Sequence, residues 1–115
     1  MTCDQLLDFI TERMRMSHIY QPLLIRALIE AGGTATLRQL AHAFLAQDEN
    51  QLRFNEKLIK EMPNRVLTKH GIVRHDGPLV SLVVPTLRYV ERAQLKMACE
   101  QRLQEFIHKG KTRPL

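Results

Sequence analysis

The order of helical and β-prone segments between residues 23 and 84 constrains the fold of this 115-residue chain more than any other sequence feature. A helical stretch ends at Gly32-Gly33, because glycine adopts the left-handed conformation that closes a helix at low steric cost. Further helical segments follow and end at Gly71. Two short β-prone runs within 72–84 then flank Asp76-Gly77-Pro78, which is a hairpin-turn signal. The sequence therefore predicts helices followed by a β-hairpin.

Apolar residues at helical spacing set the approximate bounds of the helices. Between residues 37 and 45 they follow the i, i+3, i+4, i+7, i+8 rule of an amphipathic helix. Asp48 and Gln51 form a capping-box pattern at the start of the next helix, and Pro63 interrupts that helix because its ring does not fit a helix interior. We expect helices at about 3–14, 22–31, 37–45, 48–61, 63–70 and 86–108, and short strands at 34–36, 72–75 and 79–84.

This order of elements, with a short strand before the second helix and a hairpin at the end, is typical of a winged helix. The predicted fold class is mainly α, a winged helix-turn-helix with a short β-hairpin wing and flanking N- and C-terminal helices. A usual winged helix has one helix between its second helix and the wing, whereas here Pro63 divides that segment into two helices. The expected division is an N-terminal helix and linker at 1–17, a winged-helix domain at 18–85, a C-terminal helix at 86–108 and a disordered basic tail at 109–115.

Basic residues are concentrated in the second half of the chain. Residues 1–50 hold 4 basic and 6 acidic side chains, and residues 51–115 hold 13 basic and 6 acidic ones. Such a basic half is suited to bind a polyanion such as double-stranded DNA, although a merely solvated surface would have the same composition. No apolar run approaches the roughly 18 residues of a membrane span, and the N-terminus lacks the pattern of a secretory signal. We expect a cytoplasmic protein with no membrane partner.

The helix at 63–70 and the wing carry the residues best suited to contact DNA. Arg65 and Lys69 are four residues apart and project from one side of a helix, and arginine and asparagine fit base edges in the major groove. This helix is favoured as the reader because it runs directly into the first wing strand, but the preceding helix with Arg53 and Asn55 on its expected outer face is the alternative. The competing interpretation is a solvated basic face. The candidates are Asn64, Arg65, Thr68 and Lys69, Arg74 and His75 in the wing, and Arg53, Lys57 and Lys60 on the preceding helix.

A second group of polar residues lies just before the helix that starts near Pro22. A helix N-terminus offers free backbone amides and the positive end of the helix dipole, so it binds anions such as phosphate. The competing interpretation is an interhelix linker whose ring side chains pack locally. The candidate anion contacts are Arg13, Arg15, Ser17, His18, Tyr20 and Gln21.

Catalytic signatures are absent from the sequence. The five histidines show no zinc-ligand spacing, and there is no nucleophile elbow, phosphate-binding loop or dinucleotide fingerprint. Cys3 and Cys99 are isolated and are expected to be reduced thiols without a chemical role. We therefore expect no catalytic residues, no metal and no cofactor in this chain.

Three runs, 14–22, 46–51 and 65–73, resemble the N-terminal region of bacterial HNH-type, restriction-like endonucleases, some of whose relatives carry a HIT-type hydrolase module. The resemblance implies a winged-helix targeting domain that positions a C-terminal nuclease effector, whose zinc and catalytic residues are not in this chain. Endonucleases of this kind often resemble modification-dependent restriction enzymes, so sensing of a modified base or a phosphorothioate linkage is a further option. The turn at Tyr20-Gln21-Pro22, which combines apolar surface with nearby arginines, would suit a weakly hydrated sulfur.

The expected function is duplex DNA binding as the targeting domain of such an endonuclease. The alternative from another class is a winged-helix protein-interaction or dimerisation module that pairs with a second copy, and a third is a fragment that contributes substrate contacts to a nucleotide hydrolase. The C-terminal helix distinguishes the first two, because an apolar stripe exposed in the monomer would favour docking. That stripe consists of Leu87, Val90, Leu95, Ala98, Leu103 and Phe106.

Overall fold

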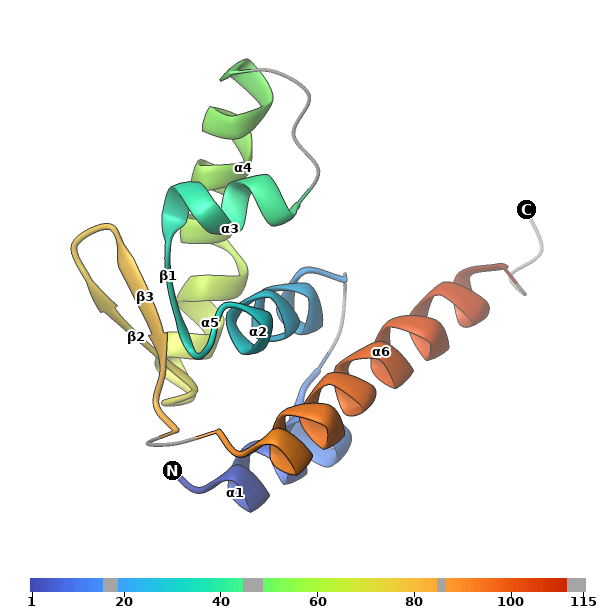
Figure 1. Ribbon diagram of the computed structural model, residues 1–115. Coiled ribbons are helices and arrows are strands. Elements are labelled where there is room, and N and C mark those ends of the chain that lie inside the picture. Colours follow the sequence, from blue (N-terminus) through green and yellow to red (C-terminus); the bar gives the residue numbers. More distant parts are fainter. Residues whose placement is uncertain (16–18, 45–48, 85–86, 112–115) are drawn as a thin grey trace.

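The computed structural model describes residues 1–15, 19–44, 49–84 and 87–111. In this part of the chain the fold is mainly helical, with one three-stranded antiparallel sheet. The helices are α1 (Cys3–Asp8), its continuation as a π-helical turn η1 (Phe9–Arg13), α2 (Tyr20–Glu30), α3 (Leu37–Ala43), α4 (Glu49–Glu61), α5 (Pro63–Lys69) and α6 (Tyr89–Lys111), and the strands are β1 (Thr34–Thr36), β2 (Val73–Asp76) and β3 (Leu79–Leu82) (Figure 1).

The sheet has the strand order β1-β3-β2, so β3 lies in the middle. Val80 of β3 lies opposite Ala35 of β1 on one side and opposite His75 of β2 on the other. Gly77 turns the hairpin with a φ of 58°, in the left-handed region that glycine enters without strain. The hairpin therefore forms at the predicted turn, although β2 begins and ends one residue later than expected and β3 ends two residues earlier.

Gly32 and Gly33 connect α2 to β1, as the sequence predicted. Their φ values are 88° and 107°, which other residues rarely adopt. The amide of Gly33 donates to the Leu28 carbonyl at 2.7 Å and closes α2, while its carbonyl accepts from the Leu82 amide at 2.7 Å. One glycine thereby ends a helix and joins that end to β3.

Helix caps fix the start of α1 and α3. The Thr36 side chain accepts from the Gln39 amide at 3.1 Å, and the Gln39 side chain accepts from the Thr36 amide at 2.9 Å. Thr2 and Gln5 form the same reciprocal capping box. The capping box predicted at Asp48 lies outside the described residues.

A single hydrophobic core joins the N-terminal helix, the sheet and α6. Helix α2 lies between α1 and α6 on one side and the sheet and α5 on the other (Figure 1). The core is therefore formed by residues from three predicted segments, the N-terminal helix, the winged-helix domain and the C-terminal helix. Its buried side chains include Leu6, Phe9 and Ile10, then Leu24, Ile25, Leu28 and Ile29 of α2, Ile59 and Leu67, Ile72 and Val80, and Leu95 and Cys99 of α6.

Two arginines attach α6 to the ends of other helices. Arg92 Nη2 donates to the Ile29 carbonyl in the last turn of α2 at 3.2 Å, and Arg102 Nη2 donates to the Met14 carbonyl that follows η1. The Ile29 carbonyl also accepts from the Gly32 amide at 3.1 Å. A cation close to a helix C-terminus is stabilised by the negative end of the helix dipole.

The predicted apolar stripe of α6 is mostly covered in the monomer. Its central residues are buried, Leu87 and Phe106 are partly buried, and only Val90 is largely open, at 64% exposure. Cys99 joins the buried side, at 0% exposure. The helix also extends to Lys111, so residues 109–111, which were expected in a disordered tail, are helical. Residues 112–115 lie outside the described part. The buried members of the predicted stripe are Leu95, Ala98 and Leu103.

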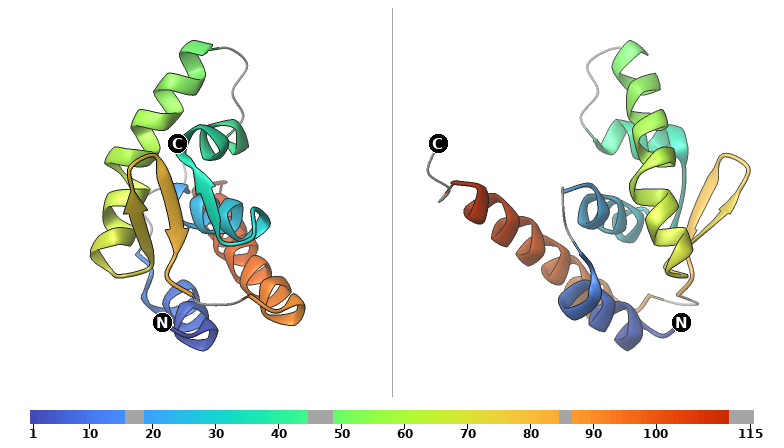
Figure 2. Two further views of the ribbon diagram at one scale, coloured as in Figure 1. Left: turned by 60° about the vertical axis from the view of Figure 1, so that its left-hand side comes forward. Right: turned by 180° about the vertical axis from the view of Figure 1, so that it is seen from behind.

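Helices α4 and α5 lie end to end around Pro63 (Figure 2). The Met62 amide donates to the Leu58 carbonyl at 3.0 Å and the Val66 amide donates to the Met62 carbonyl at 3.2 Å, so helical hydrogen bonds are found on both sides of the proline. Pro63 is the first residue of α5, a position where an amide proton is not needed. The two predicted helices are therefore one interrupted helical element.

Asn55 lies on the inner side of α4, which corrects its predicted place on the outer face. Its side chain is only 8% exposed, and its Nδ2 donates to the Ala41 carbonyl in the last turn of α3 at 3.1 Å. The spacing explains the position, because Leu52 and Ile59 are three residues before it and four after it and are both buried. Asn55 therefore joins α3 to α4 and is not available to a ligand.

We predict that Asn55→Ala destabilises the domain by about 1 kcal/mol, because a buried hydrogen bond is lost. Asn50→Ala on the same helix is the control, since Asn50 is exposed. Denaturant unfolding followed by circular dichroism measures both. Equal stability of the two variants would show that the Asn55 hydrogen bond contributes nothing.

Candidate functional site

The outer side of α4 and α5 carries five basic side chains, which we call the cationic face. Four of them line one hollow, together with Leu37 at the start of α3, Glu56 and Glu61. Arg65 also lines a second hollow with Glu61, Met62, Val66 and Lys69. Arg65 therefore joins the basic residues of α4 to the last one of α5. The cationic face consists of Arg53, Lys57, Lys60, Arg65 and Lys69, all exposed.

Most of this positive charge has no ion-pair partner in the part of the chain that the structure describes. Arg53 contacts Glu49 at 3.6 Å. Among the described residues, no carboxylate lies within ion-pair distance of Lys57, Lys60, Arg65 or Lys69. Cations in this arrangement attract a polyanion, and they bind it with the release of its counterions.

Arg38 of α3 pairs with two carboxylates of α4 and offsets one of the two negative charges that oppose the cationic face. Its guanidinium donates to Glu49 and, at 3.0 Å, to Glu56. The hydrogen bond from Arg38 is the largest influence on Glu49 and lowers the pKa of that carboxyl below its ordinary value. Glu61 is left as the acidic residue of the hollow without such a partner among the described residues.

Asn64 cannot contact a ligand, which corrects its predicted role as a base reader. Its side chain is 0% exposed, and neither Oδ1 nor Nδ2 has a hydrogen-bond partner among the described residues. Leu67, three residues further along α5, is also 0% exposed, so Asn64 lies on the inner side of the helix. Arg65, Thr68 and Lys69 are exposed, as predicted.

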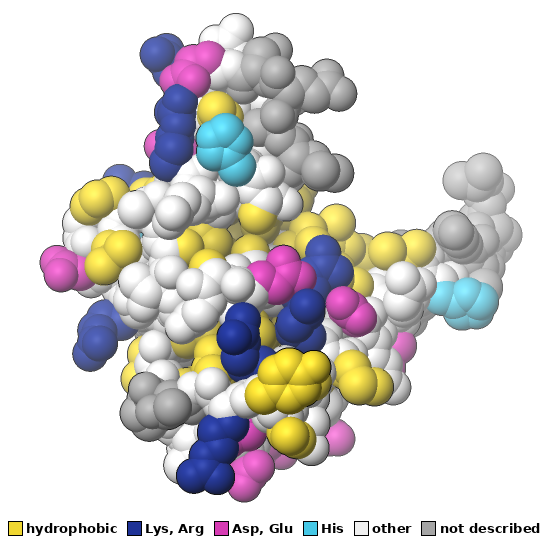
Figure 3. Space-filling view, viewed as in Figure 1, with side chains coloured by type: hydrophobic (Ala, Val, Ile, Leu, Met, Phe, Trp, Pro, Cys, Tyr) yellow, Lys and Arg dark blue, Asp and Glu magenta, His cyan; other side chains and the backbone are white. Residues whose placement is uncertain are grey.

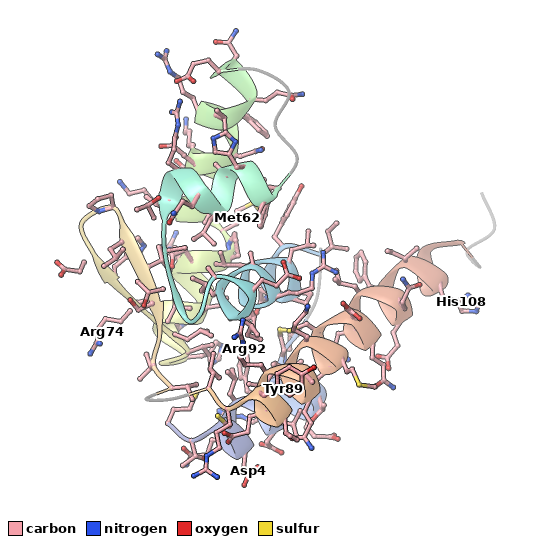
Figure 4. All side chains as sticks on the ribbon, in the orientation of Figure 1. Asp4, Met62, Arg74, Tyr89, Arg92 and His108 are labelled. Carbon is pink, nitrogen blue, oxygen red and sulfur yellow. The ribbon has the colours of Figure 1, made fainter. Side chains whose placement is uncertain are left out.

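The two candidates in the hairpin lie on opposite faces of the sheet. Successive side chains of a strand alternate, and His75 shares a side with Val80 of the core, whereas Arg74 pairs with Ser81 on the other side. Arg74 projects from the hairpin away from the helices (Figure 4). Both side chains are exposed, but Arg74 does not belong to the cationic face.

The predicted anion site before α2 is not assembled by its described side chains. Gln21 is 5% exposed and its Nε2 donates to the Arg15 carbonyl at 2.9 Å, so its amide is used within the protein. The Tyr20 ring stacks on Phe44 with ring centres 6.1 Å apart. The buried amide of Gln21 corrects its predicted role as a phosphate contact. The Tyr20 ring packs locally, and the phosphate contact by its hydroxyl stays a prediction.

The remaining members of that group are placed separately. The Arg13 guanidinium lies over the Phe9 ring at 5.9 Å from its centre, a cation-π contact within η1. Arg15 is exposed. Ser17 and His18 lie outside the described residues.

The described residues offer no grouping suited to hold a metal ion. No set of three or more His, Cys, Asp or Glu side chains among them is arranged to hold a metal ion. Cys3 and Cys99 form no disulfide. Burial raises the pKa of the Cys99 thiol to about 12, so it stays protonated and is a poor nucleophile.

Comparison of the chain with protein-family models, curated protein sequences and solved structures finds no match. Within the described residues, none of the helices combines the length and the apolar character needed to cross a membrane.

Phe54, which is not among the predicted site residues, is 64% exposed on the solvent side of α4. Its position was visible in the helical spacing, since Asn50 and Lys57, four residues before it and three after it, are both polar. A phenylalanine among such residues lies outside the core. It is therefore an apolar side chain beside the cationic face.

We predict that Asn64→Leu raises the free energy of unfolding by about 1 kcal/mol, because it replaces unsatisfied buried polar atoms with an apolar group of similar size. Binding to duplex DNA, measured as a test of the predicted contact, should match that of the unaltered chain within a factor of about two. Chemical denaturation and fluorescence anisotropy provide the two measurements. Loss of DNA binding by a folded Asn64→Leu variant would restore Asn64 as a DNA contact.

Proposed function

We propose that this chain is a winged-helix DNA-binding domain whose cationic face binds the backbone of duplex DNA. The observation that carries this proposal is the concentration of five basic side chains on α4 and α5, four of them without an ion-pair partner among the described residues. A solvated face needs no such arrangement, whereas phosphate groups at regular spacing are complementary to it.

The order of the elements supports the winged-helix assignment. Helix α2, strand β1, helix α3, the interrupted helix α4–α5 and the β2–β3 hairpin follow one another, and β1 pairs with the hairpin through β3. In helix-turn-helix and winged-helix proteins, the helix before the wing enters the major groove. The helix in that position here is the one that carries the cationic face.

In the proposed complex, the lysines contact phosphates and Arg65 is placed to reach a base edge. Lysine acts as a point charge, whereas the arginine guanidinium donates two parallel hydrogen bonds and recognises guanine in the major groove. Thr68 is exposed on α5 between Arg65 and Lys69 in the sequence and can donate to a phosphate. Since phosphate contacts dominate, the affinity falls with increasing salt concentration.

The resemblance of the sequence to HNH-type endonucleases extends the proposal. On that basis the domain positions a nuclease whose catalytic part is not in this chain, and it acts in the cytoplasm. Sensing of modified bases or of phosphorothioate linkages stays a prediction of the resemblance. The packed side chains of Tyr20 and Gln21 do not favour the turn before α2 as the place where this occurs.

The second candidate function is a protein-interaction or dimerisation module, and a different surface supports it. Hydrophobic side chains lie close together over the first half of α6, with Lys and Arg side chains next to them (Figure 3). Tyr89 is 88% exposed and Met97 69% exposed. A contiguous exposed apolar patch is typical of an interaction site, but the core side of α6 is already covered within the monomer.

We predict that Arg65→Ala combined with Lys69→Ala weakens binding to a 20-base-pair duplex about tenfold at low salt, because two charge-assisted contacts are lost. The slope of log affinity against log salt concentration should decrease by about two. Fluorescence anisotropy at several salt concentrations measures both quantities.

The matched control for this experiment is Arg88→Ala, directly before α6, combined with Lys96→Ala on α6. It removes the same net charge from side chains that are at most weakly paired, with Glu91 at 4.0 Å and Glu30 at 3.4 Å. Equal weakening by the two double variants would mean that only the net charge matters and would refute the cationic face as the binding site.

A further inference from the structure

Phe54 is exposed to solvent, and the buried side of α4 does not include it. More than half of its side chain is exposed, at 64%, while Leu52 and Ile59 on the opposite side of the helix are 7% and 0% exposed. The domain therefore gains little stability from this ring. An exposed phenylalanine in such a position is available to a ligand with an apolar surface.

The surroundings of Phe54 combine apolar and positive groups. Lys57 lies one helical turn further on, and Arg53 precedes the ring directly in the sequence. Met62, which is 36% exposed, follows two turns along the interrupted helix, at the hollow that Glu61, Arg65, Val66 and Lys69 also line. A surface that bound only phosphates would need the cations but not the apolar side chains.

We propose that Phe54 stacks on a nucleobase of the bound DNA that has left the base-paired stack. This inference rests on the proposed function and specifies its ligand as DNA with an exposed base face, as in an extrahelical, mismatched or single-stranded base. Positive charge complementary to the backbone, together with aromatic rings on which bases stack, is the combination found in sites that bind unpaired nucleotides.

The physical reason for this choice is the position of the apolar faces in DNA. In an intact duplex, each base face is covered by its neighbours, so an aromatic ring on the protein meets only base edges and sugars. An unstacked base offers both of its faces. Unstacking a base costs free energy, and this cost is smallest for a mismatched or already unpaired base. Phe54 therefore favours DNA that contains such a base.

The absence of tryptophan from the chain allows a direct test. Phe54→Trp introduces a single indole on the exposed side of α4, and stacking on a base quenches its fluorescence. Four ligands are titrated at low salt: a single strand, the perfect duplex of the same sequence, that duplex with one unpaired central base, and heparin, which has negative charge but no bases. Met97→Trp is the matched control, since Met97 is 69% exposed on α6.

We expect the single strand and the duplex with an unpaired base to quench the indole of the Phe54→Trp variant strongly, the perfect duplex to quench it weakly and heparin to leave it unchanged. The Met97→Trp variant should show no quenching with any ligand. Phe54→Ala should lose about tenfold in affinity for the duplex with an unpaired base and less than about twofold for the perfect duplex. Its thermal unfolding should match that of the unaltered chain, because the ring is exposed.

Two results would overturn the inference and leave the proposed function intact. One is equal quenching of the Phe54→Trp variant by heparin and by the single strand. The other is binding of this variant to labelled DNA, seen by anisotropy, without any quenching of its indole. If anisotropy shows no binding to any of the DNA ligands at low salt, the proposed function itself fails along with the inference.

Discussion

The burial of Ile59 and Leu67 is the constraint on which the account of this surface depends. Both side chains are 0% exposed, one in α4 and one in α5, and together they fix which side of the interrupted helix faces the core. Pro63 separates them without removing α5 from that alignment, because it occupies the first position of the second helix. With the inner side fixed, the remaining positions follow from helical geometry. The basic side chains of both helices must lie on the outer side, where they form the cationic face.

Electrostatics within the domain then determine how much of this charge is available. Arg38 reaches from α3 to Glu49 and Glu56 and holds two carboxylates of α4 in one network. Such exposed ion pairs contribute little to stability. Their larger effect is on the surface charge, because a carboxylate paired with Arg38 offsets less of the positive charge of the cationic face. The fold therefore separates a buried inner side, which includes Asn55 and Asn64, from an outer side with mostly unpaired positive charge and one exposed aromatic ring, Phe54.

Features set by local chemistry were predictable from the sequence, and features set by packing were less so. The Gly32-Gly33 turn and the Asp76-Gly77-Pro78 hairpin were predicted correctly because glycine at positive φ is a local requirement. Asn55 and Asn64 were placed on the outside because they are polar, yet each lies at helical spacing from a buried leucine. Residue type was given more weight than spacing at those positions. Within the candidate site, the exposed basic residues of α4 and α5 were predicted, but their separation from Arg74 depends on strand register, which the sequence did not determine.

Nuclear magnetic resonance tests the central claim most directly, by following the backbone amide signals of the labelled chain as a short duplex is added. The account predicts that the largest chemical-shift changes lie in residues 49–69 and at the nearby hairpin, that they decrease together as salt is added, and that the outer side of α6 changes little. Changes concentrated on α6 around Tyr89 and Met97, with α4 and α5 unaffected, would contradict it and would favour the interaction module.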